Sequence, residues 1–195
     1  METRIPTTEV TGVYGAMVKR FSRKILGDVP EPLGIYWHNP VVLRFYLGLG
    51  QKSAKWDQCD ENLKSYAHMA VASMLGCSWC LDFGYFMAHN EGLDVAKARE
   101  VPRWRESDVF APLERDVMEY AEAMSQAPPT VSDELSDRLL EALGAPALVE
   151  LAAYIALANV YTRTNIAFGI EAQEFAAACG LAPLAEPGNA VASVS

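Results

Sequence analysis

The stretch that decides the fold is "ENLKSYAHMAVASMLGCSWCLDFG", residues 61–84. Over residues 61–75 the apolar side chains recur at i, i+3, i+4 and i+7, the spacing of one face of a helix. The members of this stripe are Leu63, Tyr66, Ala67, Ala70, Val71 and Met74. The helix leads directly to Cys77 and Cys80, two cysteines with two residues between them. The sequence therefore predicts a C-x-x-C motif at the junction of two helices.

The rest of the chain also has helical patterns, and it lacks the alternation of apolar and polar residues that is typical of strands. Pro40 and Pro112 suit the first turns of helices, and Ser132 suits an N-cap. Gly144 followed by Pro146 predicts the end of one helix. Further helices are expected at 9–26, 94–100 and 147–168, the last one apolar almost all round. We therefore expect an all-α fold.

A weak internal similarity suggests that this helical bundle has two halves. At an offset of 85 residues, "SYAHMAVASMLGCSWCLDFG" overlays "ELAAYIALANVYTRTNIAFG". Both segments are long apolar helices that enter a polar turn. We expect one domain over residues 1–182, with its core at about 30–175, and a flexible tail over 183–195.

The charge of the chain argues against several classes of partner. The formal net charge is −9, which disfavours nucleic acids and anionic membranes. We find no run of about 18 apolar residues that predicts a membrane span. The N-terminus, "METRIPTTEV", lacks the charged and then apolar order of a secretory signal. These features predict a cytoplasmic protein with no nucleic-acid or membrane partner.

Cys77 and Cys80 are compatible with more than one chemistry. At a helix N-terminus a thiolate is favoured, and a second thiol nearby converts a sulfenic acid to a disulfide. Gly76 can supply the break that starts the new helix. A thioredoxin-like motif would follow a strand, and structural zinc would need two further ligands, for which no second pair at suitable spacing exists. A redox dithiol is favoured, two inert buried thiols remain open, and no metal or cofactor is expected.

The motif and its flanking helices resemble the carboxymuconolactone decarboxylase and alkyl hydroperoxidase D-like family. The likeness covers about residues 30–175, including "GCSWCLDFG" and the turn from Asn165 to Gly169. It implies an all-α homo-oligomer, commonly a trimer or hexamer, that reduces hydroperoxides through the cysteine pair. By the same resemblance Cys80 is the peroxidatic cysteine and Cys77 the resolving one, and a small thiol or a reductase restores both.

The chain departs from the family pattern E-x11-C-x-x-C-x3-H at the residues that handle protons. The glutamate falls on Ser65 and the histidine on Gly84, and Trp79 stands where some members have another histidine. His68 lies one turn after Ser65, and Glu61 one turn before it, so we expect this pair to rebuild a relay.

Two further carboxylates have candidate roles near this helix. Asp82 matches an acid that the family pattern often shows. The candidate catalytic residues are therefore Cys80, Cys77, His68, Glu61 and Asp82. Glu150 lies in an apolar helix and needs a cationic partner, for which Arg163 and Lys64 are the candidates.

The leading hypothesis is a dithiol oxidoreductase with peroxidase activity, whose partners are a hydroperoxide and a thiol reductant. One alternative is a lyase or decarboxylase-like enzyme on the same scaffold, in which the cysteines are bystanders. Another is a redox sensor without catalytic activity, in which disulfide formation alters assembly.

Overall fold

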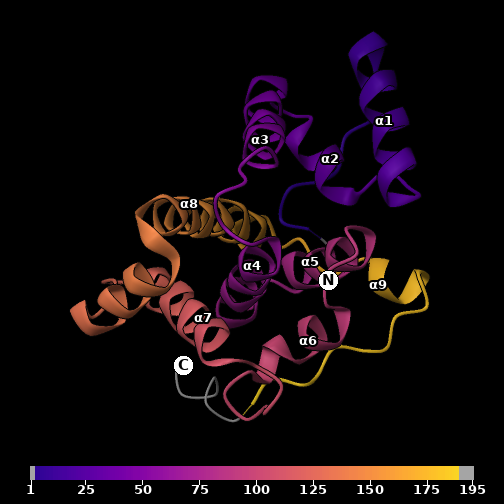
Figure 1. The fold of residues 1–195 in the computed structure, drawn as a ribbon. Helices are drawn as coiled ribbons and strands as arrows, with labels where there is room; N and C mark the ends of the chain where they lie inside the picture. The colour runs from indigo at the N-terminus through magenta and orange to yellow at the C-terminus, as the bar shows by residue number, and fades with distance from the viewer. Residues whose placement is uncertain (1–2, 189–195) are drawn as a thin grey trace.

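The computed structural model describes residues 3–188, and over this range it contains helices and no strand (Figure 1). The all-α prediction is therefore confirmed. The helices are α1 (Gly12–Leu26), α2 (Glu31–Tyr36), α3 (Pro40–Ser53), α4 (Glu61–Leu75), α5 (Ser78–Asn90), α6 (Val95–Glu100), the 3-10 helix η1 (Val101–Arg103), α7 (Pro112–Ser125), α8 (Asp133–Phe168) and α9 (Phe175–Ala178).

Helix α4 is the centre of the fold and packs against α5, α7 and α8 (Figure 1). Its N-cap is Asp60, whose carboxylate accepts the amides of Asn62 and Leu63. The predicted stripe is buried from Leu63 to Val71, while Met74 stays partly exposed. The helix that the sequence pattern singles out is thus the helix on which the core is built.

The predicted signals at α7 and α8 are confirmed, with one difference. Pro112 opens α7, and the Ser132 hydroxyl accepts the amide of Leu135 at the start of α8. Gly144 has φ 76° and ψ 161°, which is not helical, and Pro146 follows it. The helix resumes after this break and runs to Phe168, so the expected stop is a kink within α8.

The first three helices stand apart from the bundle around α4 (Figure 1). They have their own small core of Val10, Val18, Leu33 and Leu43. Helix α2 lies in a segment for which no helix was expected, and its Pro32 fits the first turn.

The predicted helix at 9–26 is present from Gly12, but most of its apolar stripe is exposed. Val13 is 91%, Met17 60% and Phe21 54% exposed, whereas Val18 is buried. Nothing else in the described part of the chain covers this face, so α1 carries an open apolar surface.

Part of the expected tail is held against the body. The carbonyl of Pro183 accepts Nε of Arg99, and the amide of Ala185 donates to the Arg99 carbonyl. The last part of that expected tail, 189–195, lies outside the described residues.

One helix, α8, is long and apolar enough to cross a membrane by length and composition alone, contrary to the expectation of no such run. Core helices of soluble proteins pass the same test. Only 22% of the apolar window in α8 is buried. Length and composition alone are therefore weak evidence that α8 spans a membrane.

A buried ion pair joins α4 to α8. Lys64 Nζ lies 3.0 Å from Glu150 Oε1 and 2.8 Å from Glu61 Oε1, and it donates to the Trp56 carbonyl. Burial acts to raise the pKa of Glu150, but the amide of Gln58, Lys64 and the amide of Cys59 together lower it. Of the two candidate partners, Glu150 therefore pairs with Lys64.

We predict that Lys64→Met lowers the free energy of unfolding by about 3 kcal/mol, because it leaves the Glu150 carboxylate buried without its cation. Urea denaturation measures this. Since the folded-state pKa of Glu150 is lowered, the stabilisation is present above its unfolded pKa and is lost as the pH falls below that value.

The matched control is Arg138→Met, which breaks the half-exposed pair with Asp116. It should cost less than about 1 kcal/mol, since solvent screens that pair. Equal losses in the free energy of unfolding would show that the buried Lys64–Glu150 pair stabilises the fold no more than the half-exposed pair does.

Candidate functional site

The two cysteines lie where α4 ends and α5 begins. Gly76 has φ 77°, a left-handed conformation that glycine adopts without strain, and it reverses the chain as the sequence predicted. Cys77 follows as the N-cap of α5, and its Sγ accepts the amide of Cys80 at 3.2 Å. The two side chains are joined by a disulfide, with their Cα atoms 5.3 Å apart. Both cysteines are buried, each 1% exposed.

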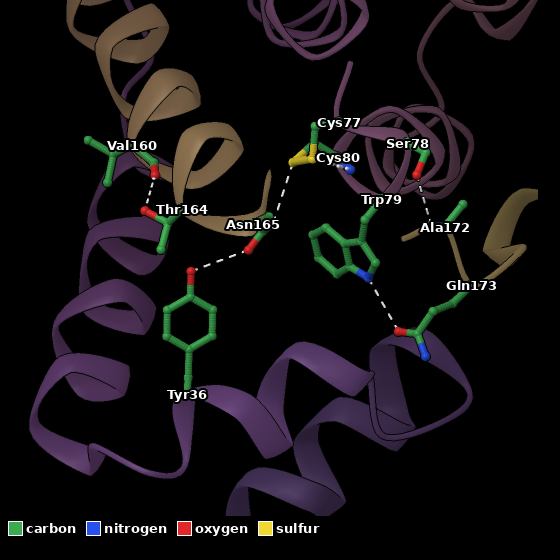
Figure 2. The surroundings of a disulfide bond; sticks show 10 residues. All are labelled: Tyr36, Cys77, Ser78, Trp79, Cys80, Val160, Thr164, Asn165, Ala172 and Gln173. Atoms are coloured by element: carbon green, nitrogen blue, oxygen red, sulfur yellow. Dashed lines mark hydrogen bonds between the residues drawn. A yellow bond between two sulfur atoms is a disulfide. The ribbon is translucent and has the colours of Figure 1, made fainter. Parts of the chain in front are cut away.

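The sulfur of Cys80 also contacts a polar side chain from the far end of α8 (Figure 2). Nδ2 of Asn165 donates to Cys80 Sγ at 3.4 Å, and Oδ1 of Asn165 accepts the hydroxyl of Tyr36 at 3.3 Å. Tyr36 is the last residue of α2. Helices α5 and α8 therefore meet at this sulfur atom, and α2 is linked to it through Asn165.

The segment between α8 and α9 crosses the middle of the motif. The Ser78 hydroxyl accepts the amide of Ala172, and the indole of Trp79 donates to Oε1 of Gln173 (Figure 2). The same Oε1 accepts the amide of Glu31 at the start of α2. Both residues between the cysteines are thus fixed to this segment.

An apolar wall lies beside the disulfide. Trp79 packs against the buried cluster of Ala72 and the two cysteines. Its ring stacks on Phe83 with centroids 4.8 Å apart, and the ring of Phe175 lies edge-on to both. The wall gives the site a planar aromatic surface next to its sulfur atoms.

His68 lies against Gly84, the position at which the resemblance places a histidine. A Cβ at Gly84 would lie 3.3 Å from Cδ2 and 3.7 Å from Nε2 of His68, and 3.0 Å from Cγ of Met69. The imidazole therefore lies directly beside the space that a side chain at position 84 would enter.

The environment of His68 favours its neutral form. His68 is partly exposed as a residue, but its Nε2 is buried and has no hydrogen-bond partner within the described range. Burial lowers the pKa of His68, and a hydrogen bond to the backbone of Cys80 opposes this in part. The ring is therefore an unprotonated base at neutral pH.

The other two candidate carboxylates have partners elsewhere. Glu61 is exposed and pairs with Lys64, and no hydrogen bond joins it to His68 in residues 3–188. The oxygens of Asp82 accept the amides of Phe175 and Ala176, so Asp82 holds the start of α9. Of the five residues singled out, the structure brings together Cys77, Cys80 and His68.

Asn165 and Tyr36 contact the motif or its partner but were not among the residues predicted for the site. One signal for Asn165 was present, because the internal overlay at an offset of 85 residues places Asn165 opposite Cys80. For Tyr36 the sequence contains no such signal.

The described residues do not contain a metal centre. No group of three or more His, Cys, Asp and Glu side chains within residues 3–188 is arranged to hold a metal ion. What the arrangement can do is two-electron chemistry at a dithiol, with an amide donor and a neutral imidazole close to the motif.

Comparisons with known proteins agree with this geometry. The sequence profile of the Carboxymuconolactone decarboxylase family matches residues 40–123. YnjA of Escherichia coli K12 is 36% identical over 154 residues, which are 77% of this chain and 84% of that protein.

Two solved structures share the fold at low sequence identity. A variant of the debrominase Bmp8 in complex with 2,3,4-tribromopyrrole has a TM-score of 0.77 and 22% identity, over 91% of this chain and 97% of that one. The alkylhydroperoxidase AhpD core of a peroxidase-related protein from Ralstonia eutropha JMP134 has a TM-score of 0.74 and 16% identity, over 89% and 94%. The chain belongs to the carboxymuconolactone decarboxylase family, whose alkyl hydroperoxidase D-like members share its fold.

Proposed function

We propose that this protein is a dithiol oxidoreductase that reduces hydroperoxides at Cys77 and Cys80. The observation that carries the proposal is the pair itself, disulfide-bonded at the start of α5, with a hydrogen-bond donor on each sulfur. Donors of this kind favour a thiolate, the form of cysteine that attacks a peroxide. Family membership supports the same chemistry.

The proposed cycle has three steps. The Cys80 thiolate attacks the terminal oxygen of the hydroperoxide, the O–O bond breaks, and Cys80 becomes a sulfenic acid. The alkoxide takes up the proton that the Cys80 thiol lost on ionisation and leaves as the alcohol. The Cys77 thiol then displaces water from this sulfenic acid and forms the disulfide. A dithiol reductant gives two electrons and two protons to the disulfide, restores both thiols and is itself oxidised.

His68 is the proposed proton acceptor for this cycle. Its ring is neutral and lies against Gly84, where the family pattern has its histidine. An imidazole from α4 thus supplies, from the neighbouring helix, the group that position 84 of α5 lacks.

A second candidate reaction is reductive removal of a halogen from an aromatic ring. The aromatic wall of Trp79, Phe83 and Phe175 favours it, because a planar ring can stack there beside the sulfur atoms. A thiolate that accepts an oxygen from a peroxide can accept a bromine in the same way. The second thiol then forms the disulfide, the ring gains a proton, and bromide leaves.

We predict that Cys80→Ser abolishes the consumption of cumene hydroperoxide in the presence of dithiothreitol, because the attacking sulfur is lost. Cys77→Ser should lower the rate without abolishing it, because dithiothreitol must then reduce the buried Cys80 sulfenic acid directly. The matched controls are Cys59→Ser and Cys179→Ser, which remove the two free cysteines. Both controls should keep the wild-type rate.

The same five proteins are then given 2,3,4-tribromopyrrole, and released bromide is measured. Bromide release that depends on the cysteine pair, without hydroperoxide consumption, favours the second candidate. If the wild type and both active-site variants are indistinguishable with either substrate, the redox proposal is wrong.

We predict that His68→Gln lowers the rate of hydroperoxide reduction at neutral pH by about 100-fold, in the range expected for the loss of a general base. Because the pKa of His68 is lowered, the limb of the wild-type pH profile that reports His68 should lie below pH 6.5, the ordinary value for histidine, and it should vanish in the variant. His89→Gln, at an exposed histidine of α5, is the control. Equal rates for the two variants would exclude His68 from the cycle.

We predict that Gly84→Ala destabilises the fold by about 1–3 kcal/mol, since the new methyl group would push Met69 and the His68 ring out of place. Gly48→Ala is the control, because a methyl group added to that glycine of α3 would have no neighbour within 4 Å. It should be neutral or stabilising by up to about 1 kcal/mol, as expected in a helix. Thermal unfolding of both variants checks this, and equal melting temperatures would contradict it.

A further inference from the structure

We propose that Asn165, oriented by Tyr36, stabilises the thiolate of Cys80 and thereby makes this buried sulfur able to attack substrate. The inference deepens the proposed function and rests on it for the reaction, but its direct readout is the acidity of one thiol. In this assignment Asn165 is a catalytic residue, because it touches the reacting atom. Tyr36 is a positioning residue, because it acts through Asn165.

Burial makes the donor necessary. Cys80 is 1% exposed, and an apolar environment disfavours a thiolate relative to a thiol. Within residues 3–188, the hydrogen bond that Cys80 Sγ receives comes from Nδ2 of Asn165, which is itself only 3% exposed. An amide N–H aimed at a sulfur atom from inside the protein stabilises negative charge there without having to give up water when the thiol ionises.

Tyr36 fixes which end of the amide faces the sulfur. Its hydroxyl donates to Oδ1 of Asn165, so Nδ2 is left pointing at Cys80 (Figure 2). If the amide were turned over, the oxygen would face the sulfur and oppose a negative charge on it. Burial raises the pKa of Tyr36, so the hydroxyl keeps its proton.

A neighbouring tyrosine shows that the Tyr36 contact is specific. The Thr164 hydroxyl donates its one hydrogen to the Val160 carbonyl, so Tyr46 donates to the Thr164 oxygen. The rings of Tyr36 and Tyr46 lie 5.0 Å apart and both hydroxyls interact with Thr164, but of the two only the Tyr36 hydroxyl also donates to Asn165. Of these two tyrosines, it is Tyr36 that reaches Asn165.

The two cysteines depend on different donors. Cys77 Sγ accepts the backbone amide of Cys80, which no side-chain substitution removes. Cys80 Sγ depends on the side chain of Asn165. A substitution at position 165 should therefore change the acidity of Cys80 and leave that of Cys77 unchanged.

The test measures the pKa of each cysteine alone, from the ultraviolet absorbance of its thiolate. In a Cys77→Ser background, Asn165→Ala should raise the pKa of Cys80 by about one unit, a tenfold loss of thiolate below the pKa. In a Cys80→Ser background, the same substitution should leave the pKa of Cys77 unchanged. Tyr36→Phe should shift Cys80 in the same direction by a smaller amount, and Tyr46→Phe should have no effect.

Asn165→Asp separates charge from packing. Aspartate has the size of asparagine, so a packing role predicts that this variant stays closer to the wild type than Asn165→Ala does. A role in thiolate stabilisation predicts the reverse, with a larger rise in the pKa of Cys80, because a carboxylate beside the sulfur repels it. Circular dichroism establishes whether each variant is folded. If the variants at position 165 do not fold, Tyr36→Phe, which removes a single oxygen, still tests the proposal.

Failure of this inference can be told apart from failure of the proposed function. An unchanged pKa of Cys80 in Asn165→Ala and Tyr36→Phe, or equal shifts at Cys77 and Cys80, would overturn the role of Asn165 even if the wild type consumes hydroperoxide. A selective shift at Cys80 supports that role. If such a protein consumes no hydroperoxide, only the assigned reaction is lost.

Discussion

The left-handed turn at Gly76 is the constraint on which the site depends. It ends α4 and lets the amide of Cys77 donate back to the Ala72 carbonyl at 2.9 Å, so that α5 begins at once. Because the reversal takes a single residue, Cys77 becomes an N-cap and Cys80 lies in the first turn. This first-turn position is the one from which Cys80 Sγ accepts Nδ2 of Asn165. The central helix of the protein thus holds its reactive pair at a fixed place and orientation.

The same turn explains why residues from distant parts of the chain meet at the motif. The end of α8 supplies Asn165, the end of α2 supplies Tyr36, and the segment before α9 supplies Gln173. These side chains orient and enclose the cysteines, and none of the three is itself a nucleophile toward peroxide. Such a division of labour is expected when catalysis needs a precise surrounding for one atom.

The sequence predicted the parts of this structure that depend on local interactions. Periodicity identified α4, and glycine and serine preferences identified Gly76 and Ser132, because those signals act within one turn of the chain. Helices α2 and α9, of six and four residues, were missed, whereas α6, also of six residues, was predicted. The helix expected at 9–26 is present from Gly12, but a sequence pattern does not determine what covers the apolar face of Val13, Met17 and Phe21.

The residues of the candidate site also divide into those that local signals predicted and those that depend on contacts between distant parts of the chain. The cysteine pair followed from its spacing, and His68 from its place on α4. Asn165 is 85 residues from Cys80 in the sequence, and Tyr36 is 129 residues from Asn165. Local sequence patterns do not predict contacts over such separations. For Glu61, Lys64 three residues on was a closer partner than Ser65 or His68, so an ion pair formed in place of the expected relay.

Helix α2 belongs to the group of helices that stands apart from the bundle, yet it contributes Tyr36 to Asn165 and the amide of Glu31 to Gln173. The hydrogen bonds that hold this group therefore reach the disulfide through Asn165 and Gln173. Whatever holds α1–α3 more firmly in one redox state than in the other must shift the reduction potential of Cys77 and Cys80 by the same free energy. The open apolar face of α1 belongs to that same group, so a contact made there would affect the reduction potential only to the extent that it favours one redox state.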